Sequence, residues 1–173
     1  MLPPSRVGAL CVALFVLPAW GGHSLNSDQA RLLSAWLGRH PDLRAATDAD
    51  CDCSDDISQV RAGYGGAWKP VPDYHPYVIS GDFNNDGQAD FAVVLIDTKQ
   101  GKLTGRYAVV IFNGPVRDAD QRPAFFKAGL DLKYHGFFYG PPRKKPYRLI
   151  LGRFEAEGAT FVPEGATYKM VGP

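Results

Sequence analysis

Excess charge of one sign is almost absent from this sequence. The 173 residues include 19 Lys and Arg against 18 Asp and Glu, so the formal net charge is only +1. Proteins that bind nucleic acid normally carry a basic excess, because much of their affinity comes from neutralising phosphates. The composition therefore excludes nucleic acid from the partners that we expect.

Short catalytic motifs are also missing. The sequence contains neither GxSxG nor HExxH, which mark the nucleophile elbow of hydrolases and the helix of zinc proteases. Catalytic groups can still be assembled from residues that are far apart in the chain. A small secreted hydrolase that uses His75 or His135 with an acidic partner is therefore kept as an alternative.

Long apolar runs are scarce, and the sequence has one, Val7 to Trp20. It follows the basic residue Arg6 and is shorter than the roughly 20 residues that span a bilayer. Small residues come next, and cleavage after Gly21 or after Ser24 would satisfy the small-x-small rule of export signals. We therefore expect a signal peptide over residues 1–24, with an uncleaved N-terminal anchor as the alternative.

The remaining residues, 25–173, are expected to form one domain. No other segment is long and apolar enough to cross a membrane, so we expect no membrane span after signal cleavage. The export signal predicts a periplasmic or extracellular location. Without Arg6 the acidic and basic residues balance at 18 each, since 19 less one is 18.

Cysteine is rare. Of the three cysteines, Cys11 lies in the expected signal peptide, which leaves Cys51 and Cys53. Two thiols alone are too few for a structural zinc site. In an oxidising compartment they can bond to each other, stay free or bridge to another chain, and we expect the local disulfide.

The apolar pattern predicts an α+β fold. Asn26 to Asp28 provide a helix cap, and Gly38 with Pro41 ends that helix; a second helix is expected from the Ser54 cap to Gly63. Most of the later chain alternates strands and turns. The expected strands are 77–79, 91–97, 106–112, 136–139, 147–154, 160–162 and 166–171, with 124–127 as strand or short helix.

Strands 91–97 and 106–112 are apolar on both faces, so we expect them at the centre of a sheet with a cover on each side. The N-terminal helices are the natural cover. The predicted architecture is therefore N-terminal helices packed on a mainly antiparallel sheet, with one ion-binding loop between two strands.

That loop is the most informative stretch of the sequence, GDFNNDGQAD at positions 81–90. Oxygen-bearing side chains stand at every second position, Asp82, Asn84 and Asp86. Gly87 permits a sharp reversal because it tolerates positive φ, and Asp90 closes the run. Ca²⁺ takes six to eight oxygen ligands, so the spacing indicates a calcium site. The alternative is a polar hairpin whose side chains bond only to the backbone.

The segment resembles the calcium loop of FG-GAP and VCBS repeats, through "GDFNNDG" and the following "DFAVV". The resemblance implies Ca²⁺ as the bound ion. It implies that Asp82, Asn84, Asp86 and Asp90 bind the ion through their side chains and that Gln88 binds it through its carbonyl oxygen. Those families stack many copies, whereas this chain has one. An EF-hand is rejected, because its twelfth position needs an acidic residue and here holds Val93.

A second acidic stretch partly repeats the spacing, with Asp48, Asp50, Asp52 and Asp56. Cys53 stands where the turn glycine is needed. We interpret the stretch as a solvated acidic turn before a helix, with a degraded second cation site as the alternative.

Aromatic and basic residues interleave at 134–148, YHGFFYGPPRKKPYR. One interpretation is a recognition loop for a protein or an anionic or glycan component of the envelope, through stacking and cationic contacts. The other is a buried strand followed by a solvated loop. The function that we expect is an exported, calcium-stabilised binding or accessory domain.

Overall fold

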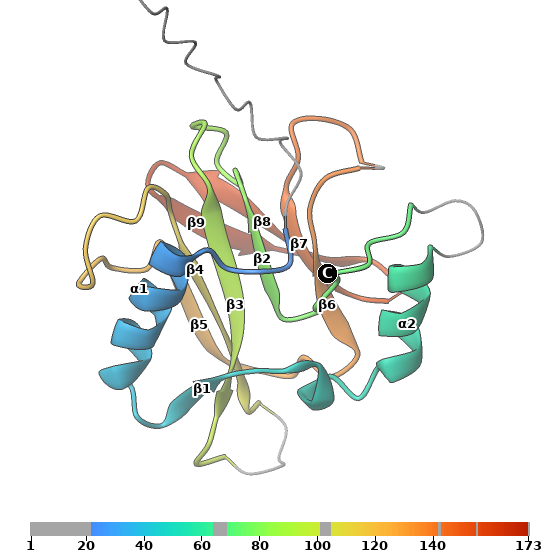
Figure 1. The fold of residues 1–173 in the computed structure, drawn as a ribbon, viewed down its shortest axis with the longest axis horizontal. Helices are drawn as coiled ribbons and strands as arrows, with labels where there is room; N and C mark the ends of the chain where they lie inside the picture. Colours follow the sequence, from blue (N-terminus) through green and yellow to red (C-terminus); the bar gives the residue numbers. More distant parts are fainter. Residues whose placement is uncertain (1–21, 64–68, 101–104, 142, 155, 173) are drawn as a thin grey trace, which may run out of the picture.

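The fold was analysed in a computed structural model that describes residues 22–63, 69–100, 105–141, 143–154 and 156–172. The apolar run of the expected signal peptide lies outside the described residues. Within the described residues, two α-helices, one short 3-10 helix and nine strands form an α+β fold, as predicted (Figure 1). The elements are α1 (Ser27–Gly38), β1 (Leu43–Ala45), the 3-10 helix η1 (Asp48–Asp50), α2 (Ser54–Ala62), β2 (Val78–Gly81), β3 (Asp90–Asp97), β4 (Tyr107–Phe112), β5 (Phe125–Leu130), β6 (His135–Phe138), β7 (Leu149–Arg153), β8 (Gly158–Glu164) and β9 (Thr167–Val171).

The first sheet is antiparallel and has five strands in the order β1-β3-β4-β5, with β2 also paired to β3. Strands β1 and β2 share one edge of β3. The first pairs with its C-terminal half and the second with its N-terminal half, and Val94 lies between them. The short β1 was not predicted, because three residues are too few to show a strand periodicity.

The second sheet is antiparallel in the order β6-β7-β8-β9. It was expected as part of one sheet, because sequence patterns identify strands but not which strands pair. The predicted terminal hairpin is confirmed as β8 and β9, paired from Thr160↔Val171 to Glu164↔Thr167. The segment that was left open as strand or short helix is β5.

The two central strands are covered on both faces, as their composition predicts. Residues Phe91, Val93 and Leu95 of β3 pack with α1, whereas Ala92, Val94 and Ile96 point into a core shared with the second sheet. The cover on the second face differs from the expectation, because most of it is a second sheet, with Ile57 of α2 in the same core. Figure 1 shows α1 and the second sheet on opposite sides of the first.

Helix α1 begins with a capping box. The side chain of Asn26 accepts from the backbone N–H of Gln29, and the side chain of Gln29 accepts from the backbone N–H of Asn26. Such reciprocal bonds satisfy two otherwise unpaired donors. Its buried face includes Leu32, Leu33 and Trp36.

Cys51 and Cys53 form the expected local disulfide. Both residues are buried, and they pack with Ile57 of α2 in the core between the sheets. Cys53 is the N-cap of α2 and makes no side-chain cap bond, so Ser54 is the first helical residue and not the cap. Within the described residues, neither helix is long and apolar enough to cross a membrane.

Candidate metal centre

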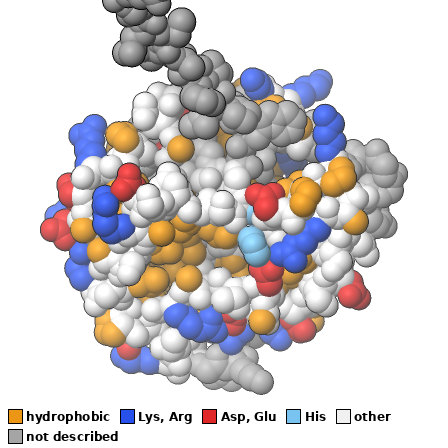
Figure 2. All heavy atoms as spheres, in the orientation of Figure 1, with side chains coloured by type: hydrophobic (Ala, Val, Ile, Leu, Met, Phe, Trp, Pro, Cys, Tyr) orange, Lys and Arg blue, Asp and Glu red, His pale blue; other side chains and the backbone are white. Residues whose placement is uncertain are grey.

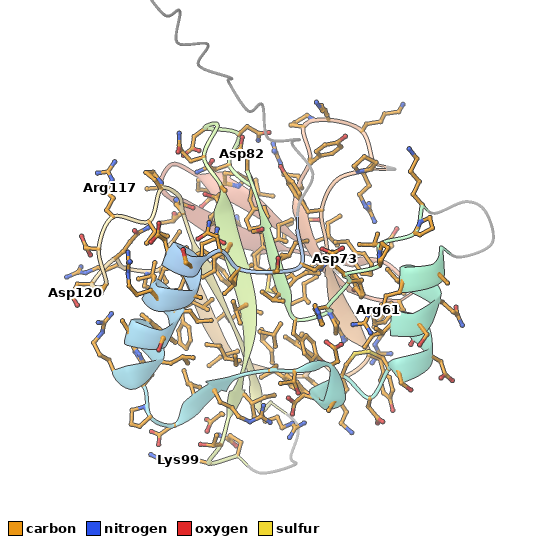
Figure 3. All side chains as sticks on the ribbon, in the orientation of Figure 1. Arg61, Asp73, Asp82, Lys99, Arg117 and Asp120 are labelled. Atoms are coloured by element: carbon orange, nitrogen blue, oxygen red, sulfur yellow. A yellow bond between two sulfur atoms is a disulfide. The ribbon has the colours of Figure 1, made fainter. Side chains whose placement is uncertain are left out.

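The predicted ion loop connects β2 to β3 at one end of the first sheet. The pair Gly81↔Asp90 is the last rung of the antiparallel ladder, so the residues between them form a closed hairpin loop. Figure 3 places the label of Asp82 on this loop, at the top of the molecule. Four of the predicted ligand residues, Asp82, Asn84, Asp86 and Gln88, therefore lie in the loop, and Asp90 is the first residue of β3 at its end.

Side chains inside the loop bond to its own backbone. The carboxylate of Asp82 accepts from the N–H groups of Asp86 and Gly87, each at 3.0 Å. Asn84 Oδ1 also accepts from the N–H of Asp86, and Asp86 Oδ1 accepts from that of Gln88. These bonds curl the backbone around the oxygens. A carboxylate has about four lone-pair directions, so each group keeps acceptor capacity for an ion.

Two residues of the loop have left-handed backbone conformations. Gly87 has φ of +82°, as its predicted role requires, and Asn85 has φ of +63°. Asparagine is among the few residues other than glycine that adopt this region readily. The two reversals therefore fall on residues that tolerate them.

Asp90 differs from the other four residues because its side chain is fully buried. Its Oδ1 accepts from the N–H of Gly114, and its Oδ2 accepts from the N–H of Phe83 and the hydroxyl of Tyr168. The pKa of Asp90 is raised above its ordinary value, chiefly by burial. The charge of Asp86 adds to this increase, and the three hydrogen bonds act against it. Asp90 therefore connects the ion loop to β9 and to the end of β4.

Gly114 is required for this close packing. A Cβ atom at residue 114 would lie 2.5 Å from the carbonyl oxygen of Ala89, a backbone atom that cannot swing away. Because Gly114 has no side chain, the segment after β4 approaches closely enough for the N–H of Gly114 to donate to Asp90 at 2.8 Å.

Negative charge gathers around the loop. Burial and the charges of Asp82 and Asp90 raise the pKa of Tyr139 to about 12. Burial, followed by the charges of Asp90, Asp86 and Asp82, also raises the pKa of Tyr168. All three carboxylates therefore act on Tyr168, and two of them also act on Tyr139. Neighbouring carboxylates repel one another in the absence of a cation, and a bound divalent ion would relieve this repulsion.

The donor set fits a hard cation with oxygen ligands. Among the described residues, no group of three or more His, Cys, Asp or Glu side chains is arranged to hold a metal. Amide and carbonyl oxygens from Asn84 and Gln88 would therefore have to complete the set. Ca²⁺ accepts such neutral oxygens, whereas Zn²⁺ prefers nitrogen and sulfur.

No known relative was found. The chain matches no family model, no curated protein and no solved structure. The assignment of the loop therefore depends on its own residues and geometry.

The middle of the aromatic and basic segment contacts the ion loop. The hydroxyl of Tyr139 donates a hydrogen bond to the carbonyl oxygen of Asp82, and its ring meets Phe83 edge-on at 5.1 Å. A Cβ atom at Gly81 would lie 2.8 Å from the Tyr139 ring. The Tyr139 ring also packs against Tyr147, at 5.6 Å. Phe137 is buried and 143–146 are exposed, which agrees with the interpretation as a buried strand followed by a solvated loop. The interpretation as a recognition loop stays a prediction.

The second acidic stretch does not assemble an ion site. Asp48 bonds to Arg61 and His75, Asp50 bonds to Arg44 and Thr47, and Asp52 bonds to Tyr134. Asp56 lies in the first turn of α2. The carboxylates thus have different partners, which agrees with the interpretation as an acidic turn.

The two candidate catalytic histidines have different partners. His75 Nδ1 lies 2.9 Å from Asp48 Oδ1, so His75 does have an acidic partner. Arg61 holds the same carboxylate through a bond of 2.8 Å to Oδ2. His135 Nδ1 instead lies 2.6 Å from the carbonyl oxygen of Lys133, and burial lowers the pKa of His135.

A shallow cavity of about 480 Å³ lies next to the His75–Asp48 pair. Its lining residues are Ala46, Thr47, Asp48, Ala49, His75, Tyr77 and Val78. Figure 2 shows hydrophobic side chains gathered near the centre of this face of the molecule, with a histidine at their border.

Three relationships at these sites were not predicted. Tyr168 and Gly114 were not predicted as partners of Asp90, and Asp48 was expected in a solvated acidic turn, with an ion ligand as the alternative. The bonds of Asp90 to Gly114 and Tyr168 span 24 and 78 residues, and that of Asp48 to His75 spans 27. No local pattern in the sequence identifies partners that are so distant in the chain. The one local signal of a buried environment is the position of Asp90 directly before an apolar strand.

Proposed function

We propose that the protein is an exported domain that binds one Ca²⁺ in the loop between β2 and β3 and uses the adjoining basic segment to bind an anionic partner. The observation that carries the proposal is the row of Asp82, Asn84 and Asp86 oxygens, closed by the buried Asp90. The first two of these residues are half-buried and Asp86 is exposed. The ion would be held by Asp82, Asn84, Asp86 and the carbonyl oxygen of Gln88, with Asp90 behind them.

The first support is electrostatic. Several carboxylates lie in or beside one tight loop, and the charge of Asp86 raises the pKa of Asp90. In the absence of a cation this arrangement opposes folding, because like charges are held together. An ion that binds only the folded chain stabilises it by RT ln(1 + [Ca²⁺]/Kd), about 2.7 kcal/mol at one hundred times Kd.

The second support is the contact between the ion loop and the basic segment. Tyr139 donates to Asp82 and packs against Tyr147, whose ring lies 5.7 Å from the ammonium nitrogen of Lys145. A change in the shape of the ion loop would therefore move the rings that support the basic segment. Calcium would act by fixing the position of this surface.

The third support is the charge of that segment. Within six residues it carries four cationic side chains, of which three are exposed and one is half-buried, namely Arg143, Lys144, Lys145 and Arg148. Figure 2 shows Lys and Arg side chains at the upper right, above the loop that follows β6 in Figure 1. Such a cluster suits a partner with repeated negative charges.

A column of sulfated polysaccharide tests this surface. With Ca²⁺ present, the chain from residue 22 should be retained, and the double variant Lys144→Glu/Lys145→Glu should elute at clearly lower salt. The control Lys127→Glu/Lys169→Glu makes the same change of charge on the exposed faces of β5 and β9. It should elute close to the unmodified protein, because its substitutions lie outside the basic segment. Equal losses in the two double variants would contradict a specific surface.

A second candidate function is supported by the His75–Asp48 pair. A carboxylate on Nδ1 orients an imidazole so that Nε2 can act as a general base. Among the described residues no Ser or Cys side chain is hydrogen-bonded to His75, so water would be the nucleophile. Its proton would pass to Nε2 and then to the leaving alkoxide of an ester, giving an acid and an alcohol.

Turnover of an acyl ester of p-nitrophenol separates the two candidates. A hydrolase should lose most of its rate in His75→Ala and in Asp48→Asn, while His135→Ala serves as the matched control and keeps it. A rate equal to buffer, or equal rates in all three variants, would leave the calcium-dependent binding domain as the better account.

A further inference from the structure

The last three residues of the expected signal peptide, from Gly22 to Ser24, are part of the folded domain. Gly22 donates its N–H to the carbonyl oxygen of Ser80 at 3.0 Å, and Ser80 returns a bond of 2.7 Å to the carbonyl oxygen of Gly22. The two residues form an antiparallel bridge. Ser80 pairs with Phe91 of β3 on its other side, so Gly22 extends the sheet beyond β2.

His23 is buried beside this bridge, with 6% of its surface exposed. Its Nδ1 lies 3.0 Å from the carbonyl oxygen of His75 and 3.1 Å from that of Val78. Because both neighbours are acceptors, Nδ1 carries the hydrogen and donates it. The ring also packs against Tyr74 at 4.5 Å between centroids. His23 therefore satisfies two carbonyl groups that few other side chains could reach.

Ser24 also contacts Ser80. The hydroxyl of Ser80 lies 3.3 Å from the carbonyl oxygen of Gly22 and 3.4 Å from that of Ser24. The next residue, Leu25, packs against the core under α1, and Asn26 caps the helix. Continuous contacts therefore run from Gly22 into α1.

We propose that a leader peptidase cuts the Gly21–Gly22 peptide bond and that Gly22 is the first residue of the mature protein. Hydrolysis would add water across this amide, leaving a carboxylate on Gly21 and an ammonium on Gly22. An ammonium still donates to the carbonyl oxygen of Ser80, so the bridge to β2 is kept. This inference rests on the export that the proposed function assumes.

The other site that the sequence permits, after Ser24, is disfavoured by the fold. A chain beginning at Leu25 would lack the bridge to Ser80 and the buried ring of His23. The backbone groups of Ser80 and the carbonyls of His75 and Val78 would lose these hydrogen bonds, and Tyr74 would lose the packing of the His23 ring. The two sites leave products that differ in stability.

The full chain should be expressed with its own leader in a bacterial host, and the exported protein measured by intact mass and N-terminal sequencing. A first residue of Gly22 supports the inference, whereas Leu25, or an uncut chain, overturns it. Gly21→Leu should remove the product that begins at Gly22, because the residue before the cut must be small. Ser24→Leu, which blocks the other site, should leave that product unchanged.

A second measurement separates the fold from the processing. Chains that begin at Gly22 and at Leu25 can be released from fusions and compared by thermal melting. We expect the shorter chain to melt lower by roughly 5 °C or more. Equal melting temperatures would overturn the structural argument. A lower melting temperature for the shorter chain together with an uncut full chain would contradict export and cleavage, but not the role of Gly22 and His23.

Discussion

Tyr168 Oη donates a hydrogen bond to Asp90 Oδ2 across 3.0 Å. Through this bond β9 of the second sheet contacts the first residue of β3 in the first sheet. Phe83 and Gly114 donate to the same carboxylate, so one buried acidic group joins the ion loop, the end of β4 and β9. A buried carboxylate with several donors depends on each of them.

Tyr168→Phe should therefore destabilise the protein. The change removes one donor and leaves Asp90 buried with less compensation, which costs about 1–3 kcal/mol. Tyr134→Phe is the matched control, because its hydroxyl bonds to Asp52 at the exposed surface. Urea unfolding measures both variants, and an equal, small effect would show that Asp90 does not need Tyr168.

Gly114→Ala should also destabilise the fold, by about 1–3 kcal/mol. The new methyl group would meet the carbonyl oxygen of Ala89, and the backbone would have to shift away from Asp90. Gly38→Ala is the control, since nothing lies within 4 Å of a Cβ at that position. Thermal melting compares them; loss of stability in Gly38→Ala alone would contradict this packing.

Acid should weaken the contact between β1 and η1. The Arg44 guanidinium, together with Thr47, lowers the pKa of Asp50 below its ordinary value. Because the folded-state pKa is lower than the unfolded one, this stabilisation is present above about pH 4 and is lost as the pH falls further. Asp50→Asn should cost about 1 kcal/mol at pH 7 and progressively less below pH 4. Asp28→Asn, in an exposed pair with Arg31, should change little at either pH.

The disulfide should resist reduction in the folded protein. Cys51 is fully buried and Cys53 nearly so, so a thiolate reductant cannot approach either sulfur. A mature chain treated with reductant and a thiol label should stay unlabelled in buffer and take up two labels in urea. Rapid labelling without denaturant would mean that this part of the core opens readily.

Much of the fold could be predicted because its signals are local. The central strands have apolar residues on both faces, and Asn26 with Gln29 has the spacing of a capping box. The division into two sheets could not be predicted, since strand pairing depends on contacts between distant residues. The second sheet occupies a face of β3 and β4 that a helix could equally have covered.

The candidate site shows the same limit. The ion loop lies within ten residues, and its turn is predicted by the spacing of Asp82, Asn84 and Asp86 before Gly87. The groups that bury and connect Asp90 come from Gly114 and Tyr168, and those that orient His75 come from Asp48 and Arg61. These partners meet only in the folded chain, so the sequence carries no local sign of them.

The most direct measurement of calcium binding is the melting temperature of the chain from residue 22 with EDTA and after Ca²⁺ is restored. We expect EDTA to lower it and saturating Ca²⁺ to raise it by roughly 5–10 °C. Asp86→Ala should abolish this response. Asp118→Ala removes an exposed aspartate that accepts from Asp120 as Asp86 does from Gln88, and should keep it. Identical melting curves with EDTA and with Ca²⁺ would contradict the account.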